Sequence, residues 1–247
     1  MSQPAFKALD LPFELVYSDG EPLDDYRHFI QMHLFSDLVH QVMADRGRRD
    51  FFIGGDNFVY YSVEQARDVA AGRPYFRGPD VYFVEGVEGA RERKGWVSWE
   101  EGGRLPDFIV ELLSPSTAKI DRTIKKDLYA RTFHTRDYFL YDFDTKTLEG
   151  FHLVGNTYQP IVPDSRGRLR SEVLGLDLGL WHGALRMQKA AWIRLFHPDG
   201  RMIPAPVERA EAERERAEAE RQRAEAAKGE LARLRSLLGE RARDAGQ

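Results

Sequence analysis

The sequence predicts an α/β domain, a mixed β-sheet flanked by helices, followed by a charged helical tail. Residues 108–113 are apolar except for Glu111, and a proline turn closes the run, which is typical of a strand buried on both faces. Apolar residues recur at helical spacing over 24–45 and again over 118–133, so helices are expected before and after the strands. After Pro204-Ala205-Pro206 the composition changes to charged heptads, which marks a domain boundary.

Composition limits the chemistry that the chain can perform. A length of 247 residues and a hydrophobic content of 42% are enough for one large core with an appendage. The absence of cysteine excludes disulfides, thiolate zinc sites and a cysteine nucleophile. No secretory signal and no membrane-spanning run is present, so we expect a soluble cytoplasmic protein without a membrane partner. The net charge of −4 gives no general basic surface, so binding to nucleic acid would need a local basic patch.

The first half of the chain should supply one helix and several strands. Residues 1–22 are punctuated by proline and glycine and should form an N-terminal arm. The helix over 24–45 follows, with a core stripe of Tyr26, Phe29, Ile30, His33, Leu34, Leu38 and Val42. Two short β runs within 51–61 surround a Gly-Gly-Asp-Asn turn, and 79–85 is a second strong strand. Residues 86–104 are rich in glycine and charge and should form a long, partly mobile connection.

The second half should complete a domain that spans 23–203. The strand over 108–113 leads into the helix over 118–133, whose expected core stripe is Ile120, Ile124, Leu128 and Phe133. Residues 137–143 form another strand, and two runs around Gly155-Asn156 look like a hairpin. Later short elements are expected over 174–181 and 192–197.

The tail over 207–243 repeats with a period of seven. One heptad position is shared by Ala210, Ala217, Ala224, Leu231 and Leu238. This pattern fits a coiled coil that self-associates or recruits a partner, and it fits equally a single solvated helix with a weak alanine seam. The sequence leaves both interpretations open.

Glu111 is the residue that most needs an explanation. A carboxylate inside a buried strand costs several kcal/mol, on the order of the penalty for a buried ion, unless a cation or hydrogen bonds receive it. Asp107 shares its face but lies roughly 13 Å away at ~3.3 Å per residue, so it should support the turn or backbone instead. Asp80 on a neighbouring strand is the natural partner, because paired strands lie ~4.8 Å apart and two carboxylates can hold one hard divalent cation.

The following helix places Asp121, Lys125 and Tyr129 on one stripe, four residues apart. A lysine aimed at the carboxylate pair could orient or deprotonate a nucleophilic water and offset the charge of a phosphate under attack. Asp56 beside the Gly-Gly bend is a possible further acidic ligand. Alternatives remain open: Asp80 could cap a turn, and Glu111 with Lys125 could form a structural buried salt bridge.

These residues resemble the Uma2-family (DUF820) endonucleases, a branch of the PD-(D/E)xK nuclease superfamily. The resemblance covers approximately residues 15–200, and its matching pieces are Pro79-Asp80-Val81, Pro106 to Thr117, Asp121-x3-Lys125-x3-Tyr129-Ala130, Tyr138 to Asp142, Leu23-Asp24-Asp25 with His28 and Gln31, and Asp56 before Tyr60-Tyr61.

The resemblance implies a restriction-endonuclease-like core, with Asp80 and Glu111 as ligands of Mg²⁺ (or Mn²⁺). Leu113 stands where the superfamily has its lysine, and the resemblance implies that this role has moved to Lys125. Lys126 ranks lower because it lies about 100° around the helix at 3.6 residues per turn. The same resemblance implies that His28 lines the site.

The leading functional hypothesis is a Mg²⁺-dependent endonuclease that hydrolyses DNA. The alternative is a catalytically weak or inactive nuclease-fold module that binds or assembles partners, with homo-oligomerisation through the core or the heptad helix. The acidic net charge motivates this alternative, because a protein that grips a polyanion usually carries a basic surface.

Overall fold

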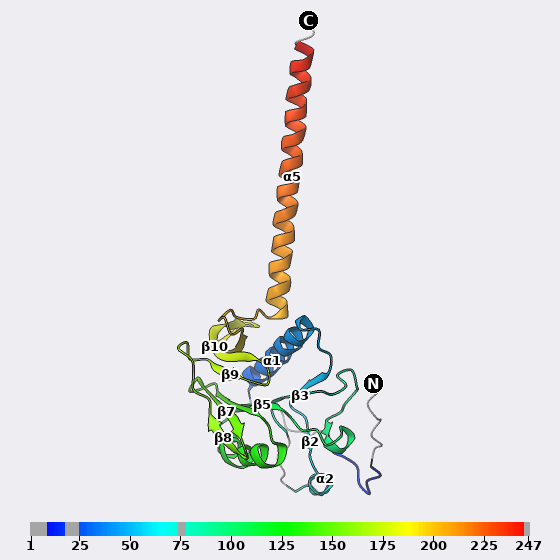
Figure 1. Cartoon of the computed structure of the whole chain (residues 1–247), viewed down its shortest axis with the longest axis vertical. Coiled ribbons are helices and arrows are strands. Elements are labelled where there is room, and N and C mark those ends of the chain that lie inside the picture. The colour runs from blue at the N-terminus through cyan, green and yellow to red at the C-terminus, as the bar shows by residue number, and fades with distance from the viewer. Residues whose placement is uncertain (1–8, 18–24, 74–77, 245–247) are drawn as a thin grey trace. The chain divides into compact units, whose positions relative to one another are not determined.

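The computed structural model describes residues 9–17, 25–73 and 78–244, with side chains of the last helix described up to residue 231 and at 233 (Figure 1). The chain divides into two compact units, residues 1–203 and 204–247. The described part of the predicted arm, 9–17, is irregular, and the rest of the arm lies outside the described residues.

The first unit contains three well-defined helical segments and eleven strands in its described part. The strands are β1 (Phe51–Gly54), β2 (Val59–Tyr60), β3 (Val81–Glu85), β4 (Trp96–Val97), β5 (Phe108–Leu113), β6 (Asp137–Asp142), β7 (Thr147–Val154), β8 (Thr157–Pro160), β9 (Leu169–Ser171), β10 (Leu176–Leu185) and β11 (Gln188–Phe196). The helical segments are α1 (Tyr26–Asp45), α2 (Val63–Ala70) and a run made of α3 (Ala118–Ile120), η2 (Asp121–Lys125), α4 (Lys126–Leu128) and η3 (Tyr129–Phe133); a short 3₁₀ turn, η1, covers Ser98–Glu100.

A six-stranded mixed sheet with the order β1-β3-β5-β6-β7-β8 forms the centre of this unit. β5 lies between an antiparallel neighbour, β3, and a parallel neighbour, β6. All six residues of β5 are buried, which confirms the predicted strand with two covered faces. A three-stranded sheet (β11-β10-β9) and a parallel pair (β2-β4) accompany it.

Helices cover both faces of the central sheet. α1 packs on one face, where the ring of Phe35 stacks on that of Phe108 at 5.6 Å. Its buried residues include Ile30, Leu34, Leu38 and Val42, as predicted, although Tyr26 and His33 are exposed. The helical run over 118–133 lies on the other face, where Tyr129 contacts Tyr138 of β6 edge to face at 5.3 Å.

The core stripe predicted for the helical run is wrong in its first half. Ile120 and Ile124 are 42% and 65% exposed, whereas Asp121 is buried. Two π-helical turns, η2 and η3, widen the helix, and the face that meets the sheet carries polar residues. The prediction assumed that the apolar residues of this helical run face the sheet. The face that packs on the sheet is instead lined by polar side chains, which apolar periodicity does not indicate.

Residues 86–104 are also more ordered than the sequence predicted. Trp96 is fully buried in β4, and its indole Nε1 donates to the carbonyl of Arg104 at 2.8 Å. The predicted loose connection is therefore a packed segment, and the tryptophan packs in the core. The sequence reading also omitted α2 and β9.

The second unit consists of α5 (Pro206–Asp244). A helix over the heptad region is as predicted, and its described side chains are exposed apart from Glu208 and Ala212. Association as a coiled coil stays a prediction. Within the described part of the chain, no helix combines the length and apolar character needed to cross a bilayer.

Candidate active site

The strand register brings Asp80 and Glu111 together. β3 and β5 pair Val81 with Val110, so Asp80, which precedes β3, lies opposite Glu111 and on the same face. The backbone N–H of Asp80 donates to Glu111 Oε2 at 3.3 Å, and the N–H of Leu112 donates to Asp80 Oδ2 at 2.6 Å. The predicted pair is thus formed across neighbouring strands.

Glycines allow the loop between β1 and β2 to approach Asp80. A Cβ on Gly55 would lie 2.2 Å from the carbonyl oxygen of Asp80, and one on Gly78 would lie 1.9 Å from that of Asn57. The Gly-Gly-Asp-Asn sequence therefore sets the position of Asp80 through close backbone contact. Asp56 itself is exposed, with φ 51°, and its role as a further ligand stays a prediction.

Lys125 faces Glu111, as predicted. Its ammonium lies 3.0 Å from Glu111 Oε1 and 2.8 Å from Asp121 Oδ1. The hydroxyl of Tyr129 donates to the same oxygen of Glu111 at 2.7 Å. Lys125 and Tyr129 of the predicted helical stripe therefore meet one strand carboxylate, and Asp121 pairs with the ammonium of Lys125.

The π-helical turns explain this convergence. A regular α-helix has 3.6 residues per turn, so side chains four residues apart do not point in the same direction. A π-helical turn contains more residues, which brings side chains four apart nearer to the same face. Asp121 begins the first widened turn and Tyr129 begins the second. Tyr138 of β6 adds support that the sequence reading missed, since its hydroxyl donates to the backbone oxygen of Asp121 at 2.9 Å.

The site holds more negative than positive charge. Three carboxylates, those of Asp80, Glu111 and Asp121, surround the single ammonium of Lys125, and Glu111 is only 1% exposed. Burial raises the pKa of Glu111 to about 8, with Lys125 opposing the shift and the other two carboxylates adding to it. Burial also raises the pKa of Asp80. Although burial works against its charge, the three carboxylates raise the pKa of Lys125, so it stays protonated.

Two carboxylate oxygens remain available for a cation. Oδ1 of Asp80 accepts no hydrogen bond from the described residues, and Oε2 of Glu111 accepts only the long bond from the backbone of Asp80. This pair fits Mg²⁺, which is usually held by one or two carboxylates together with water and substrate phosphates. Among the residues that the structure describes, no group of three or more His, Asp or Glu side chains is arranged to hold a metal.

His28 lies near the site without a hydrogen bond to it. The imidazole is buried and stacks on Phe143 at 5.5 Å. Burial raises the pKa of Asp80, and Lys125, the N–H of Leu112 and an electrostatic interaction with His28 oppose that rise. Gln31, from the same helix, instead exchanges two hydrogen bonds with the backbone of Ile193 and is structural.

Asp107 is separate from this site, as predicted. Its Oδ2 accepts the backbone N–H of Glu85 at 2.9 Å, and its carboxylate pairs with Arg104 and Arg136. It supports the backbone at the opposite end of β5.

The site is thus an acidic pair across adjacent strands, with a lysine from the following helical run directed at it. The chain belongs to the Uma2 family: the model of that family, described as "Putative restriction endonuclease", matches residues 9–188. A crystal structure titled as a "putative nuclease belonging to DUF820" from Anabaena variabilis ATCC 29413 is similar over 64% of this chain and 81% of its own, with 14% identity and a TM-score of 0.42. No curated protein matches the sequence.

Proposed function

We propose that this member of the Uma2 family is a metal-dependent endonuclease that hydrolyses phosphodiester bonds in DNA. Asp80 and Glu111 would hold Mg²⁺ or Mn²⁺. The observation that carries the proposal is the charge of the site, where one ammonium faces three buried or half-buried carboxylates and two carboxylate oxygens remain available. A divalent cation supplies the missing positive charge.

Each side chain has a role that follows from its contacts. When bound, the cation would withdraw charge from the attacked phosphate and favour the nucleophilic form of water. Lys125 would place that water and offset the charge that develops on the phosphate oxygens. Because its pKa is raised, Lys125 acts as an ammonium that donates hydrogen bonds, so of the two roles considered from the sequence, orienting fits and deprotonating does not.

Asp121 and Tyr129 are positioning residues in this scheme. Asp121 anchors the ammonium of Lys125, and Tyr129 fixes one oxygen of Glu111, which leaves the other directed toward Asp80. In the reaction, the water oxygen would form a bond to phosphorus in line with the P–O bond that breaks. The water would release a proton to solvent, and the departing oxygen would take one up.

The direct test is cleavage of duplex and single-stranded DNA by the purified protein with Mg²⁺, with Mn²⁺ and with a chelator. We expect cleavage with either metal, none with the chelator, and loss in Asp80→Asn and Glu111→Gln. Asp107→Asn is the matched control, because it removes a carboxylate charge at the other end of the same strand. Equal cleavage by wild type and Glu111→Gln would identify a contaminant and defeat the proposal.

A second candidate is a nuclease-fold module that binds or assembles partners. The observation that favours it is the pairing of Lys125 with Glu111, which already partly satisfies the buried carboxylate. Titration calorimetry separates the two functions: a Mg²⁺ or Mn²⁺ site that Asp80→Asn removes supports the enzyme, and no such site supports the module. Mass measurement of the full chain and of a chain ending at residue 203 tests self-association through α5.

A further inference from the structure

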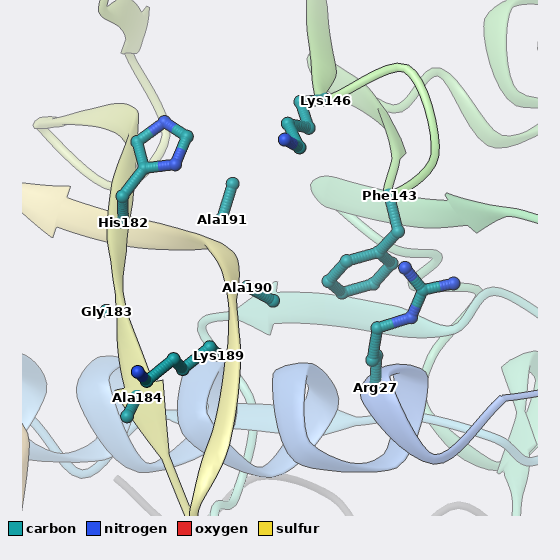
Figure 2. A pocket seen from close by; sticks show the side chains of 9 residues that line it. All are labelled: Arg27, Phe143, Lys146, His182, Gly183, Ala184, Lys189, Ala190 and Ala191. Atoms are coloured by element: carbon teal, nitrogen blue, oxygen red, sulfur yellow. The ribbon is translucent and has the colours of Figure 1, made fainter.

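A basic surface cavity lies between three elements that are distant in sequence. Its volume is about 450 Å³, and it opens between the first turn of α1, the turn from β6 to β7 and the hairpin of β10 and β11 (Figure 2). Arg27, Lys146, His182 and Lys189 line it, together with Phe143 and small residues of the hairpin. None of the described residues that line the cavity is acidic.

The charges around this basic cavity are not balanced. Arg27 forms ion pairs with Asp25 and Asp144, so its charge is compensated. Lys146 and Lys189 make no ion pair with the described residues, and both are exposed. Figure 2 shows Lys146 and His182 on different elements around the opening, with Arg27 beside Phe143. The cavity is therefore a local site for anions within a chain whose net charge is −4.

The basic cavity lies at the same end of the sheet as the candidate active site. In the β5–β6 ladder, Glu111 is opposite Leu140, and Phe143 follows three residues later, roughly 10 Å along the strand direction at ~3.3 Å per residue. Because side chains alternate along a strand, Phe143 lies on the α1 face of the sheet and Glu111 on the other face. A polymer chain bound at the carboxylates can reach the cavity where it passes around this end of the sheet.

The walls favour a phosphate over a base. Among the described lining residues, the aromatic rings are those of Phe143, which is 5% exposed, and His182. The ring of Phe143 is stacked against His28, and the guanidinium of Arg27 lies 5.1 Å from its centre. Phe143 therefore offers a nucleic-acid base no free face to stack on, whereas the lysine ammonium groups can contact phosphate oxygens.

We propose that the basic cavity binds a backbone phosphate of the nucleic-acid strand that enters the active site, a few nucleotides from the bond that is cut. Lys146 and Lys189 contact the phosphate, and His182 borders it. At one charge per ~3.4 Å of axis on each strand, a separation of roughly 10 Å along the strand direction corresponds to about three nucleotides as a minimum. The inference rests on the proposed function, since it assumes nucleic acid at Asp80 and Glu111.

The test measures binding rather than cleavage. Fluorescently labelled DNA, duplex and single-stranded, is titrated with the full chain in chelator over a series of KCl concentrations. The variant is Lys146→Asn with Lys189→Gln; asparagine is chosen because Lys146 has φ 55°, a conformation that asparagine tolerates. The charge-matched control is Lys94→Gln with Arg166→Gln, two exposed residues outside the cavity. Thermal unfolding midpoints check that both variants fold.

The slope of log K against log[KCl] should fall by about 0.9 for duplex DNA in the cavity variant, because the cavity contacts one phosphate and each lost phosphate contact removes about 0.9. The control should keep the wild-type slope. Equal slopes for wild type and the cavity variant, with metal-dependent cleavage intact, overturn the inference and leave the proposed function standing. A wild type that neither binds nor cuts DNA overturns both.

A parallel titration with inorganic phosphate identifies the source of the anion. If inorganic phosphate displaces the DNA no better than KCl does at the same concentration, the cavity is a subsite for the nucleic-acid backbone. Tight phosphate binding that the cavity variant loses, without a change in the DNA slope, makes the cavity a small-anion site and overturns the inference.

Discussion

Two acidic pairs bridge the same two strands, one at each end of the β3–β5 ladder. Glu85 and Asp107 form the first pair, and Asp80 and Glu111 form the second. In each pair, a backbone N–H of one residue donates to the carboxylate of the other. The two ends therefore share backbone geometry, and they differ in the cations around them.

At the end with Glu85 and Asp107, arginine side chains balance the charge of the carboxylates. Arg48 and Arg136 pair with Glu85, and Arg104 and Arg136 pair with Asp107. These side chains are partly exposed, between 17% and 45%. Arg48 also pairs with Asp50, so three guanidinium groups balance three carboxylates in this partly exposed network.

The end with Asp80 and Glu111 lacks positive charge. Three carboxylates share Lys125, and the side chains of Glu111 and Asp121 are only 1% and 2% exposed. Since a buried carboxylate is tolerated only when paired, this end is suited to take up a further cation, whereas the other end is not. The comparison teaches that the ratio of cations to carboxylates, more than the presence of an acidic pair, separates a candidate site from a structural network.

Removal of Lys125 should have the largest effect on stability. Lys125→Met keeps the length of the side chain and leaves Glu111 and Asp121 buried without their cation, so we expect a loss of about 3–5 kcal/mol in unfolding free energy. Arg136→Met at the other end should cost about 1 kcal/mol or less, because Arg48 and Arg104 remain. Urea unfolding of both variants measures the difference, and equal losses would show that the two ends are alike.

Metal binding should stabilise one end only. A ligand at about 100 times its dissociation constant adds ~2.7 kcal/mol to the folded state. Saturating Mg²⁺ should therefore raise the thermal unfolding midpoint of wild type and of Asp107→Asn. Asp80→Asn should show no such rise. A rise that persists in Asp80→Asn would place the cation elsewhere.

A change at Gly55 should disturb the acidic pair through the backbone. A Cβ in Gly55→Ala meets the carbonyl oxygen of Asp80 at 2.2 Å, so Asp80 must move, at a cost of about 1–3 kcal/mol. Gly89→Ala is the matched control, because its Cβ meets the carbonyl oxygens of Arg49 and Phe51 at 2.6 Å, remote from Asp80. Both variants should lose stability, and only Gly55→Ala should also lose the Mg²⁺-dependent shift.

The strands could be predicted from sequence because apolar runs and turn residues are local signals. Glu111 was detectable because a carboxylate in a buried strand conflicts with its surroundings, and strand spacing alone excluded Asp107 as its partner. The apolar stripe of the helical run was wrong because Ile120 and Ile124 face outward. A prediction from periodicity assumes a regular helix with an apolar inner face. This run has two π-helical turns, and its inner face is polar.

The basic cavity had no sequence signal. Arg27, Lys146 and Lys189 come from three elements separated by more than forty residues along the chain, and each one alone is an ordinary surface cation. Only the packing of the β10–β11 hairpin against the rest of the first unit places them together. Binding to nucleic acid would need a local basic patch, and such a patch arises here from the fold and not from the overall composition.

The smallest predicted effect concerns Glu85 and the loss of unfolding free energy at acid pH. Burial alone would raise the pKa of Glu85, but Arg136 and Arg48 outweigh it and hold the pKa below its usual 4.5. A lowered folded-state pKa contributes stability that is present above pH 4.5 and lost as the pH falls through the folded value. Because the pair is partly exposed, we expect at most about 1 kcal/mol. Urea unfolding near neutral pH and well below pH 4.5 should show a shallower acid loss in Glu85→Gln than in wild type. An identical acid loss in both would mean that the arginine-rich end contributes no pH-dependent stability.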